Sequence, residues 1–261
     1  MTYQTIIVEK KKGYAVVKLN RPHEMNAISK MMRKELYAVF VDMESDPEIK
    51  AIVLTGGEYV FSAGMDIKEM SSLPEEESDE FLKSMMRYLK RIYSYKKPVI
   101  AAVGGIALGG GFNLVTICDL VVASESAIFC HPELKFGFNP FFYPLSQIVG
   151  ITKAKEIVML GEPIGANEAL KIGLVNKVAP PEEFMQVAEN MAETLAKRSV
   201  KALEELRNIC SIVPRMDKMA ALDIESSICA LLFARDERKI QMQEVISRQK
   251  SRKKKAGINK V

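Results

Sequence analysis

The spacing of apolar residues predicts strands and helices in alternation along the first half of the chain. Two strand-like runs, QTIIVEK and YAVVKLN, flank the turn residues KKGY and together predict a β-hairpin. Apolar residues recur at helical spacing over 29–45, which is the pattern of an amphipathic helix. That stripe consists of Met32, Leu36, Val39 and Met43. Uniformly apolar runs at 51–57 and 98–103 predict strands buried on both faces, as in a parallel sheet.

Helical patterns dominate the rest of the chain. A short helix is expected within 61–70 and a longer, charged one over 75–95. After residue 150, glycine and proline residues separate further helical segments at 153–160, 166–172, 181–198, 200–211 and 217–247. Strands alternating with helices in front and a predominance of helices behind predict an α/β core followed by a helical region. We place the core at 1–195 and the helical region, with its basic tail, at 196–261.

The composition is that of an ordinary globular protein, and the net charge of +4 comes from one end of the chain. The last twelve residues, KSRKKKAGINKV, contain six of the 37 Lys and Arg residues and no acid. Without them, 31 basic residues stand against 33 acidic ones. The excess therefore belongs to a tail and not to a surface that would bind nucleic acid. Such a tail is solvated, or it contacts a polyphosphate or another subunit.

Cysteine and histidine usage gives no sign of a disulfide framework or a metal site. The four cysteines (Cys118, Cys130, Cys210 and Cys229) show no CxxC spacing and are expected to be free thiols. Two histidines are too few for a histidine-based metal site, so we predict no metal. The N-terminus lacks the basic-then-apolar order of a signal peptide, and we expect a cytoplasmic protein.

Residues 98–118 form an uncharged stretch of 21 residues, which is long enough to cross a bilayer. The strand-like runs DLVVAS and AIFC follow directly, and they suit a buried sheet better than a membrane boundary. We therefore predict a strand at 98–103, a glycine turn and a short apolar helix that begins near Gly109. No membrane association is expected.

Five of the fifteen glycines lie in GGIALGGG at 104–111. A Walker A phosphate loop requires lysine at position 110, where this chain has glycine, and GxGxxG fails in every register. What remains is a glycine turn that opens a helix, whose unpaired N–H groups can stabilise an oxyanion. FSAGMDI provides a second turn of the same kind. Close packing of helices on strands is the alternative explanation for both turns.

Several motifs in order carry a resemblance to a known family. They are NRPHEMNAIS (20–29), VLTGGEYVFSAGMDIKEM (53–70), KPVIAAVGGIALGGGFNLVTICDLVVAS (97–124) and GLVNKVAP (173–180). On these residues the sequence resembles the crotonase superfamily of enoyl-CoA hydratases and isomerases. The resemblance implies a crotonase-like spiral of ββα units with a C-terminal helical trimerisation region. It also implies a homotrimer or hexamer (a dimer of trimers).

The resemblance assigns roles to backbone groups at the two turns. The N–H groups of Met65 and Gly110 would bind the thioester carbonyl oxygen of an acyl-CoA. Coenzyme A would enter as part of this substrate, with no permanently bound cofactor. The CoA site would be lined by Met25, Ala27, Ala63, Gly64, Asp66 and Ile67. Basic residues near the C-terminus would reach the CoA phosphates.

Few carboxylates are available to act as the base. Between Lys97 and Lys153 the acids are Asp119, Glu125 and Glu133. Glu133 lies between apolar runs in CHPELKFGF and matches the catalytic glutamate of the family. Asn113 stands where many hydratases of the family have a second glutamate, and an amide cannot accept a proton from water.

One carboxylate is sufficient to shift a double bond from Δ3 to Δ2, so the sequence favours a Δ3-Δ2-enoyl-CoA isomerase. A 2-enoyl-CoA hydratase is the alternative, because some relatives with a single glutamate hydrate. A non-catalytic crotonase-like protein that binds RNA or a partner through its tail is a third reading.

The aromatic residues near the base suggest a dry acyl pocket. Phe112, Phe141, Phe142 and Tyr143 would line this substrate pocket, and a dry pocket suits proton transfer better than hydration. Packing against a neighbouring helix is the other explanation for the FFY segment. His131 lies two residues before Glu133 and either orients it or, as we favour, fills the core or its rim.

Overall fold

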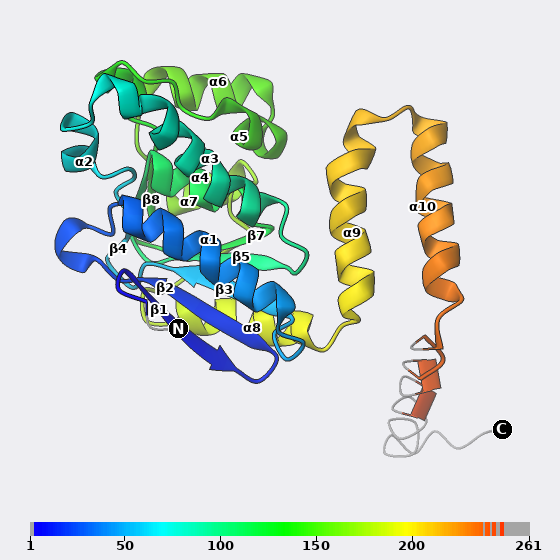
Figure 1. Ribbon diagram of the computed structural model, residues 1–261. Coiled ribbons are helices and arrows are strands. Elements are labelled where there is room, and N and C mark those ends of the chain that lie inside the picture. Colours follow the sequence, from blue (N-terminus) through cyan, green and yellow to red (C-terminus); the bar gives the residue numbers. More distant parts are fainter. Residues whose placement is uncertain (1–2, 237, 241, 244–245, 248–261) are drawn as a thin grey trace. The chain divides into compact units, whose positions relative to one another are not determined.

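The computed structural model describes residues 3–236, 238–240, 242–243 and 246–247. The chain divides into two compact units, Met1–Lys197 and Arg198–Val261 (Figure 1). The basic tail of 250–261, for which a phosphate or subunit contact was predicted, lies outside the described residues.

The first unit contains all the strands of the described residues. They are β1 (Ile6–Lys11), β2 (Tyr14–Leu19), β3 (Ala51–Thr55), β4 (Val60–Ser62), β5 (Val99–Val103), β6 (Ile106–Leu108), β7 (Leu120–Ser124), β8 (Ile128–Cys130), β9 (Ile164–Gly165) and β10 (Lys177–Ala179). Its α-helices are α1 (Lys30–Ser45), α2 (Ile67–Ser71), α3 (Ser78–Tyr93), α4 (Gly110–Thr116), α5 (Phe142–Val149), α6 (Ile151–Leu160), α7 (Ala166–Lys171) and α8 (Phe184–Ala196). Short 3-10 turns occur at η1 (Pro22–Glu24), η2 (Glu75–Glu77) and η3 (Glu133–Phe136).

The strands form two sheets that share a repeated ββα connection. The larger sheet has the order β1-β2-β3-β5-β7-β10, and the smaller has the order β4-β6-β8-β9. The successive pairs β3–β4, β5–β6 and β7–β8 each give their first strand to the larger sheet and their second to the smaller. A helix or helical turn follows each pair. The predicted spiral of ββα units is therefore confirmed, although the sequence shows no visible repeat.

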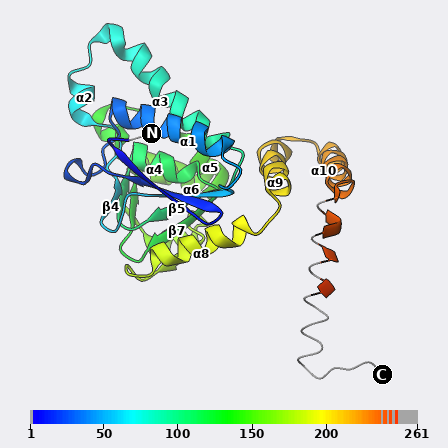
Figure 2. The ribbon, with the colours of Figure 1, turned by 60° about the horizontal axis from the view of Figure 1, so that its bottom comes forward.

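The larger sheet is covered on both faces, which explains its uniformly apolar strands. In β3, Ile52 and Leu54 join the core cluster that includes residues of α1 and α3. Ala51 and Val53 join the opposite cluster, which includes the buried face of α8. Figure 2 shows α8 on the other side of the sheet from α1 and α3. The hairpin of β1 and β2 and the helix after Ser29 are as predicted, with Ser29 capping α1 through Met32 N–H.

The uncharged stretch 98–118 folds as β5, β6 and α4. Across the described residues, no helix is long and apolar enough to span a membrane. The predicted strand, turn and helix are confirmed, but the short strand β6 was not foreseen. It lies inside the glycine run, where the sequence shows only three apolar residues, and pairing with β4 and β8 holds it in place.

Three of the five clustered glycines are required by backbone packing. A Cβ on Gly105 would lie 1.8 Å from the carbonyl oxygen of Tyr59. On Gly104 and Gly111 it would lie 2.3 Å from backbone oxygens of the segment 57–62. Real Cβ atoms do not approach oxygen this closely, so these positions accept glycine alone. The packing explanation is correct for these three positions, and only Gly109 and Gly110 remain for a site.

The second unit contains the helices α9 (Val200–Ile212) and α10 (Lys218–Phe233), joined by the 3-10 turn η4 (Val213–Arg215). Ser199 and Asp217 cap their N-termini by accepting hydrogen bonds from Ala202 N–H and Met219 N–H. The sequence predicted one helix over 217–247, but α10 ends at Phe233 and a turn at Ala234 and Arg235 interrupts it. Helical backbone resumes at Asp236 and at the described residues 238–240, 242–243 and 246–247, so the helical type is as predicted and the continuity is not.

Candidate active site

The predicted functional groups lie beyond the carboxyl ends of three adjacent parallel strands. Met65 follows β4, Gly110 follows β6 and Glu133 follows β8, and these strands are neighbours in the smaller sheet. Ser62 of β4 pairs with Ala107 of β6, and Met65 and Gly110 each lie three residues further along. Since paired parallel strands advance together, the two residues reach the same level of the sheet.

The N–H group of Met65 points away from its own pairing partner. Met65 forms a parallel bridge with Ile28. In that bridge Ile28 N–H donates to Gly64 O (2.8 Å), and Asp66 N–H donates to Ile28 O (3.4 Å). The central residue of a parallel bridge uses neither its own N–H nor its own C=O in it. The Met65 amide therefore faces the other side.

Gly110 lies close to that amide. A Cβ on Gly110 would lie 3.3 Å from Met65 N, and a Cβ on Gly64 would lie 3.1 Å from Gly110 N. Gly110 is the first residue of α4, so its N–H has no acceptor within the helix. Gly109 before it has φ +48°, in the left-handed region that favours glycine. Two main-chain donors from separate turns thus converge, and the partial positive charge of the helix N-terminus adds to them.

The carboxylate of Glu133 lies beside the same turn. A Cβ on Gly109 would lie 3.3 Å from Glu133 Oε1 and 3.9 Å from Oε2. Both oxygens are 3.1 Å from Nδ1 of His131, whose side chain is fully buried. The sequence favoured a core or rim role for this histidine, and its contact with the base was weighed only as the alternative. The HPE order was the signal for it, since one residue separates the two side chains.

Asn113 lies on α4, three residues after Gly110. Its side chain is buried, and Oδ1 has no hydrogen-bond partner among the described residues. Its backbone N–H donates to Gly109 O (2.8 Å), which fixes the first turn of the helix. An unpaired buried amide oxygen is costly and is explained when a ligand or water donates to it.

The residues predicted for CoA binding lie on two chain segments that run side by side and on the start of α2. Ala63 N–H donates to Met25 O (2.9 Å), so the segment 25–28 runs beside the segment 63–66. Arg21 Nη1 donates to Ala27 O (2.6 Å) and to Asp66 Oδ2 (2.9 Å). Ile67, also predicted for this site, is largely exposed at the start of α2.

Asp66 holds the start of α2 in place next to Met65. Its Oδ1 accepts hydrogen bonds from the backbone N–H groups of Lys68 (3.1 Å) and Glu69 (3.4 Å). Burial opposes ionisation of this carboxyl, but the hydrogen bonds from Arg21 and from these N–H groups outweigh burial and lower the pKa of Asp66. A charged Asp66 therefore fixes the helix that continues from the Met65 amide.

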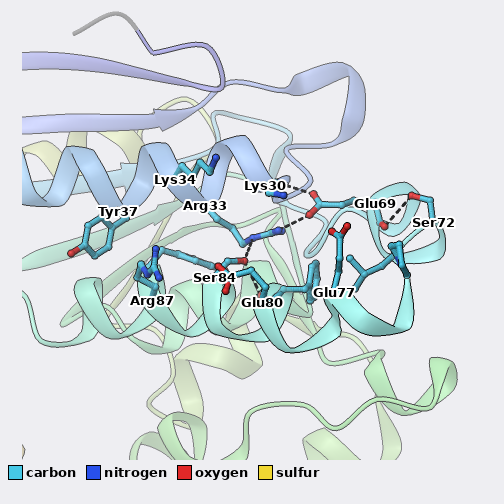
Figure 3. A pocket seen from close by; sticks show the side chains of 14 residues that line it. Lys30, Arg33, Lys34, Tyr37, Glu69, Ser72, Glu77, Glu80, Ser84 and Arg87 are labelled. Carbon is cyan, nitrogen blue, oxygen red and sulfur yellow. Dashed lines mark hydrogen bonds and ion pairs between the residues drawn. The ribbon is translucent and has the colours of Figure 1, made fainter.

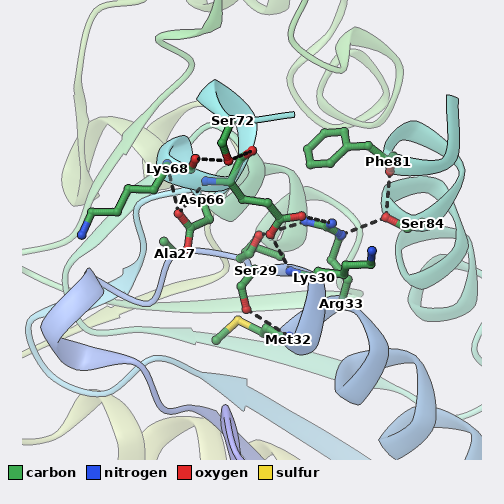
Figure 4. Close-up of polar contacts among 12 residues, drawn as sticks. Ala27, Ser29, Lys30, Met32, Arg33, Asp66, Lys68, Ser72, Phe81 and Ser84 are labelled. Atoms are coloured by element: carbon green, nitrogen blue, oxygen red, sulfur yellow. Dashed lines mark hydrogen bonds and ion pairs between the residues drawn. The ribbon is translucent and has the colours of Figure 1, made fainter. Parts of the chain in front are cut away.

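Arg33 ties α2 to α1 and α3 (Figure 4). Its side chain is 2% exposed, and its Nη2 lies 2.5 Å from Glu69 Oε1. Its Nε donates to Ser84 Oγ (2.9 Å), and its guanidinium stacks over the ring of Phe81 at 4.6 Å. Glu69 in turn accepts from Lys30 N–H (2.7 Å). This network holds α2, which begins two residues after Met65, against α1 and α3.

The predicted pocket aromatics occupy two environments. Phe112 is fully buried, with its ring 5.6 Å from that of Phe129 and 4.5 Å from that of His131. Phe141 and Phe142 are half-buried against the core, and Tyr143 is exposed. The last two residues begin the helix α5, which was not predicted because a short apolar run does not distinguish strand, helix and loop.

A surface pocket of about 620 Å³ lies elsewhere, between α1, α3 and the connection from α2 to α3 (Figure 3). Its lining mixes both signs of charge: Lys30, Arg33, Lys34 and Arg87 with Glu69, Glu77 and Glu80. None of the groups at the strand ends lines it. We place the candidate site at the strand ends because donors and a carboxylate converge there.

This arrangement can hold an oxygen atom by two N–H groups while a carboxylate exchanges a proton with a neighbouring carbon. Preorganised donors of this kind stabilise the negative charge of an enolate. Within the described part of the chain, no group of three or more His, Cys, Asp or Glu side chains is arranged to hold a metal ion.

Comparisons with known proteins identify the family of this chain. The family model described as enoyl-CoA hydratase/isomerase matches residues 9–255. A short-chain-enoyl-CoA hydratase of Clostridium acetobutylicum is 36% identical over 254 residues, which covers 96% of this chain and 97% of the relative. A crotonyl-CoA hydratase of Syntrophomonas wolfei is 34% identical over 255 residues, covering 96% and 98%.

Solved structures give the same result. The crystal structure of an enoyl-CoA hydratase from Bacillus anthracis has a TM-score of 0.90 with 28% identity, over 94% of this chain and 97% of that chain. An enoyl-CoA hydratase/isomerase from Marinobacter aquaeolei has a TM-score of 0.85 with 31% identity, over 94% and 97%. Sequence and fold together show that this chain is an enzyme of the enoyl-CoA hydratase/isomerase family, the crotonase superfamily.

Proposed function

We propose that this protein is a Δ3-Δ2-enoyl-CoA isomerase that works through an enolate held by two main-chain N–H groups. The observation that carries the proposal is the acid content of the site. Glu133 supplies a carboxylate beside Gly109, and the first turn of α4 presents the amide of Asn113 in place of a second carboxylate. A single base suffices for proton transfer, whereas activating a water is easier with two.

The reaction proceeds in two proton transfers. The thioester oxygen of a 3-enoyl-CoA accepts hydrogen bonds from Met65 N–H and Gly110 N–H. Glu133 removes a proton from C2, and the electron pair of that C–H bond moves into a dienolate whose charge rests on the thioester oxygen. The protonated Glu133 then returns the proton to C4, and the double bond forms between C2 and C3. The carboxylate is regenerated, so no co-reactant is needed.

Hydration of a 2-enoyl-CoA is the second candidate. The relatives at 36% and 34% identity are named as hydratases. The unpaired Oδ1 of Asn113 can accept a hydrogen bond from a water molecule, which Glu133 would deprotonate as it adds to C3. The enolate and its two donors would be the same in both reactions.

Two ultraviolet assays on purified protein separate these candidates. Isomerisation of 3-hexenoyl-CoA creates the conjugated enoyl chromophore, and hydration of crotonyl-CoA destroys it. The proposal predicts a higher kcat/KM for isomerisation. A kcat/KM for hydration that exceeds it would favour the second candidate.

Variants test the named residues. Glu133→Gln should lose both activities by at least about 10²-fold, as expected when a general acid–base group is removed. Glu125→Gln is the matched control, because Glu125 is exposed before β8 and should be silent. Asn113→Glu should raise the ratio of hydration to isomerisation. An unchanged ratio would show that Asn113 does not decide between the two reactions.

We also propose that the second unit mediates a homotrimer or a hexamer. Its helices expose large apolar side chains, which are Leu206, Ile212, Met219, Leu222, Leu231 and Phe233. Exposed apolar residues in such number are typical of an interface. Light scattering on the full chain would give the subunit number, and a monomeric mass would refute the proposal.

A further inference from the structure

We propose that His131 is a positioning residue that fixes the orientation of the Glu133 carboxylate during proton transfer. The inference rests on the proposed role of Glu133 as the base. Its starting point is geometric: His131 Nδ1 lies 3.1 Å from both carboxylate oxygens of Glu133. A single donor that faces both oxygens restrains the carboxylate against rotation, whereas a donor to one oxygen would leave the other free to move.

The imidazole ring is itself held rigidly. It is fully buried and stacks on Phe112 with an interplanar angle of 27°. Phe112 belongs to α4, the helix whose first residue is Gly110. His131 therefore connects the base to one proposed oxyanion donor. It contacts the carboxylate of Glu133 through Nδ1, and its ring packs on the helix that begins at Gly110.

The strand before His131 makes the same connection through the backbone. Cys130 O accepts a hydrogen bond from Gly109 N–H (2.9 Å), so the residues immediately before His131 and Gly110 are joined. A shift of the histidine relative to the glycine turn would break this bond. The distance from the carboxylate to the N–H donors is thus fixed by two independent contacts.

The polarity of the contact assigns the proton. An ionised carboxylate only accepts hydrogen bonds, so a neutral His131 can bind Glu133 only when Nδ1 carries the hydrogen. With the hydrogen on Nε2, two sets of lone pairs would face each other, and a buried N–H would lack an acceptor among the described residues. These contacts therefore place a hydrogen on Nδ1.

This assignment has a consequence for catalysis. After Glu133 takes a proton from C2, the Nδ1–H group continues to bind the carboxyl through an oxygen lone pair. The carboxyl cannot swing toward solvent, although its side chain is 17% exposed. The acquired proton is then kept facing the substrate until it is delivered to C4. Loss of the histidine should slow this step and leave thioester binding unchanged.

His131→Leu and His131→Asn form a matched pair that tests the role. The two side chains share the same branched skeleton, and the amide nitrogen of asparagine takes the place of Nδ1 as a donor. We expect His131→Leu to lower kcat for 3-hexenoyl-CoA by about 10²-fold, the effect of misplacing a reacting group by about 1 Å. KM should stay within about threefold, and His131→Asn should recover most of kcat. Both variants lose the stacked ring, so their thermal unfolding temperatures should fall together.

The outcomes separate this inference from the proposed function. If the wild type is active and the Leu variant keeps its kcat, the role of His131 is overturned while the proposed function stands. If the Asn and Leu variants lose kcat equally, the histidine only fills space, and the inference is again overturned. If the wild type converts neither 3-hexenoyl-CoA nor crotonyl-CoA, the proposed function fails and this inference fails with it.

Discussion

Replacement of Gly110 by alanine tests the proposed pair of oxyanion donors with a single methyl group. Gly110 is the first residue of α4, and its φ lies outside the left-handed region, so alanine adopts its backbone conformation. The new Cβ would lie 3.3 Å from Met65 N and 3.3 Å from Met65 Cγ. The methyl group therefore crowds the N–H that the thioester oxygen must reach.

The size of the effect follows from this distance. A thioester oxygen must come within about 2.7–3.1 Å of each donor nitrogen to be stabilised. A methyl carbon already in contact with Met65 N obstructs that approach, so one donor is lost or weakened. Loss of one oxyanion donor costs about 10²–10³-fold in kcat, which is about 2.7–4 kcal/mol. Stability should not fall in proportion, because alanine is preferred over glycine in a helix by up to about 1 kcal/mol.

The assay combines kcat for 3-hexenoyl-CoA with urea unfolding of the same preparation. Gly165→Ala is the control: Gly165 precedes α7 with φ −78°, and a Cβ there would contact nothing within 4 Å. We expect lost activity with retained stability for Gly110→Ala, and no change for the control. Wild-type kcat in a folded Gly110→Ala enzyme would refute the idea that an oxygen binds between these two amides.

Three further predictions concern the framework around the site. Gly105→Ala should prevent folding of the core, seen as insoluble protein or a lost cooperative transition, because its Cβ would lie 1.8 Å from a backbone oxygen. Arg33→Met should lower the free energy of unfolding in urea by about 3 kcal/mol, because it leaves Glu69 without its buried partner, and Arg33→Met combined with Glu69→Gln should recover part of that loss. The pKa of Asp66 is lower in the folded state than the value of about 3.9 in the unfolded state, so its ionised form stabilises the fold above that pH. This contribution is lost as the pH falls through the folded pKa, and Asp66→Asn should therefore flatten the acid side of a plot of unfolding free energy against pH. A plot identical to that of the wild type would contradict the pairing with Arg21.

Local pattern was a reliable guide wherever one periodicity covered a whole element. The helix after Ser29 follows from the helical spacing of its apolar residues. The buried strands β3 and β5 follow from their uninterrupted apolar runs. The pattern failed at β6, which has only three residues and depends on pairing with distant strands. It also missed the turn at Ala234 and Arg235, which separates α10 from the helical residues that follow it.

The glycine run shows why the site was harder to predict than the fold. Glycine is required both where backbones pack and where a ligand approaches, and the sequence does not distinguish the two. The neighbours in space do: Gly105 meets a carbonyl oxygen, whereas Gly110 meets an amide nitrogen. Likewise, the spacing of His131 and Glu133 allowed a contact but did not distinguish it from a core or rim role, because the contact depends on the turn through Pro132.

The parallel strands β4, β6 and β8 set the distances between the functional groups that follow them. Neighbouring strands lie about 4.8 Å apart in any sheet, so the separation of the groups that follow them is set by hydrogen bonding of the backbone. Insertions in distant loops would leave that separation intact. Replacing the first few residues after a strand would change the functional group presented there and preserve its position. A scaffold built in this way allows a new reaction to evolve one strand end at a time.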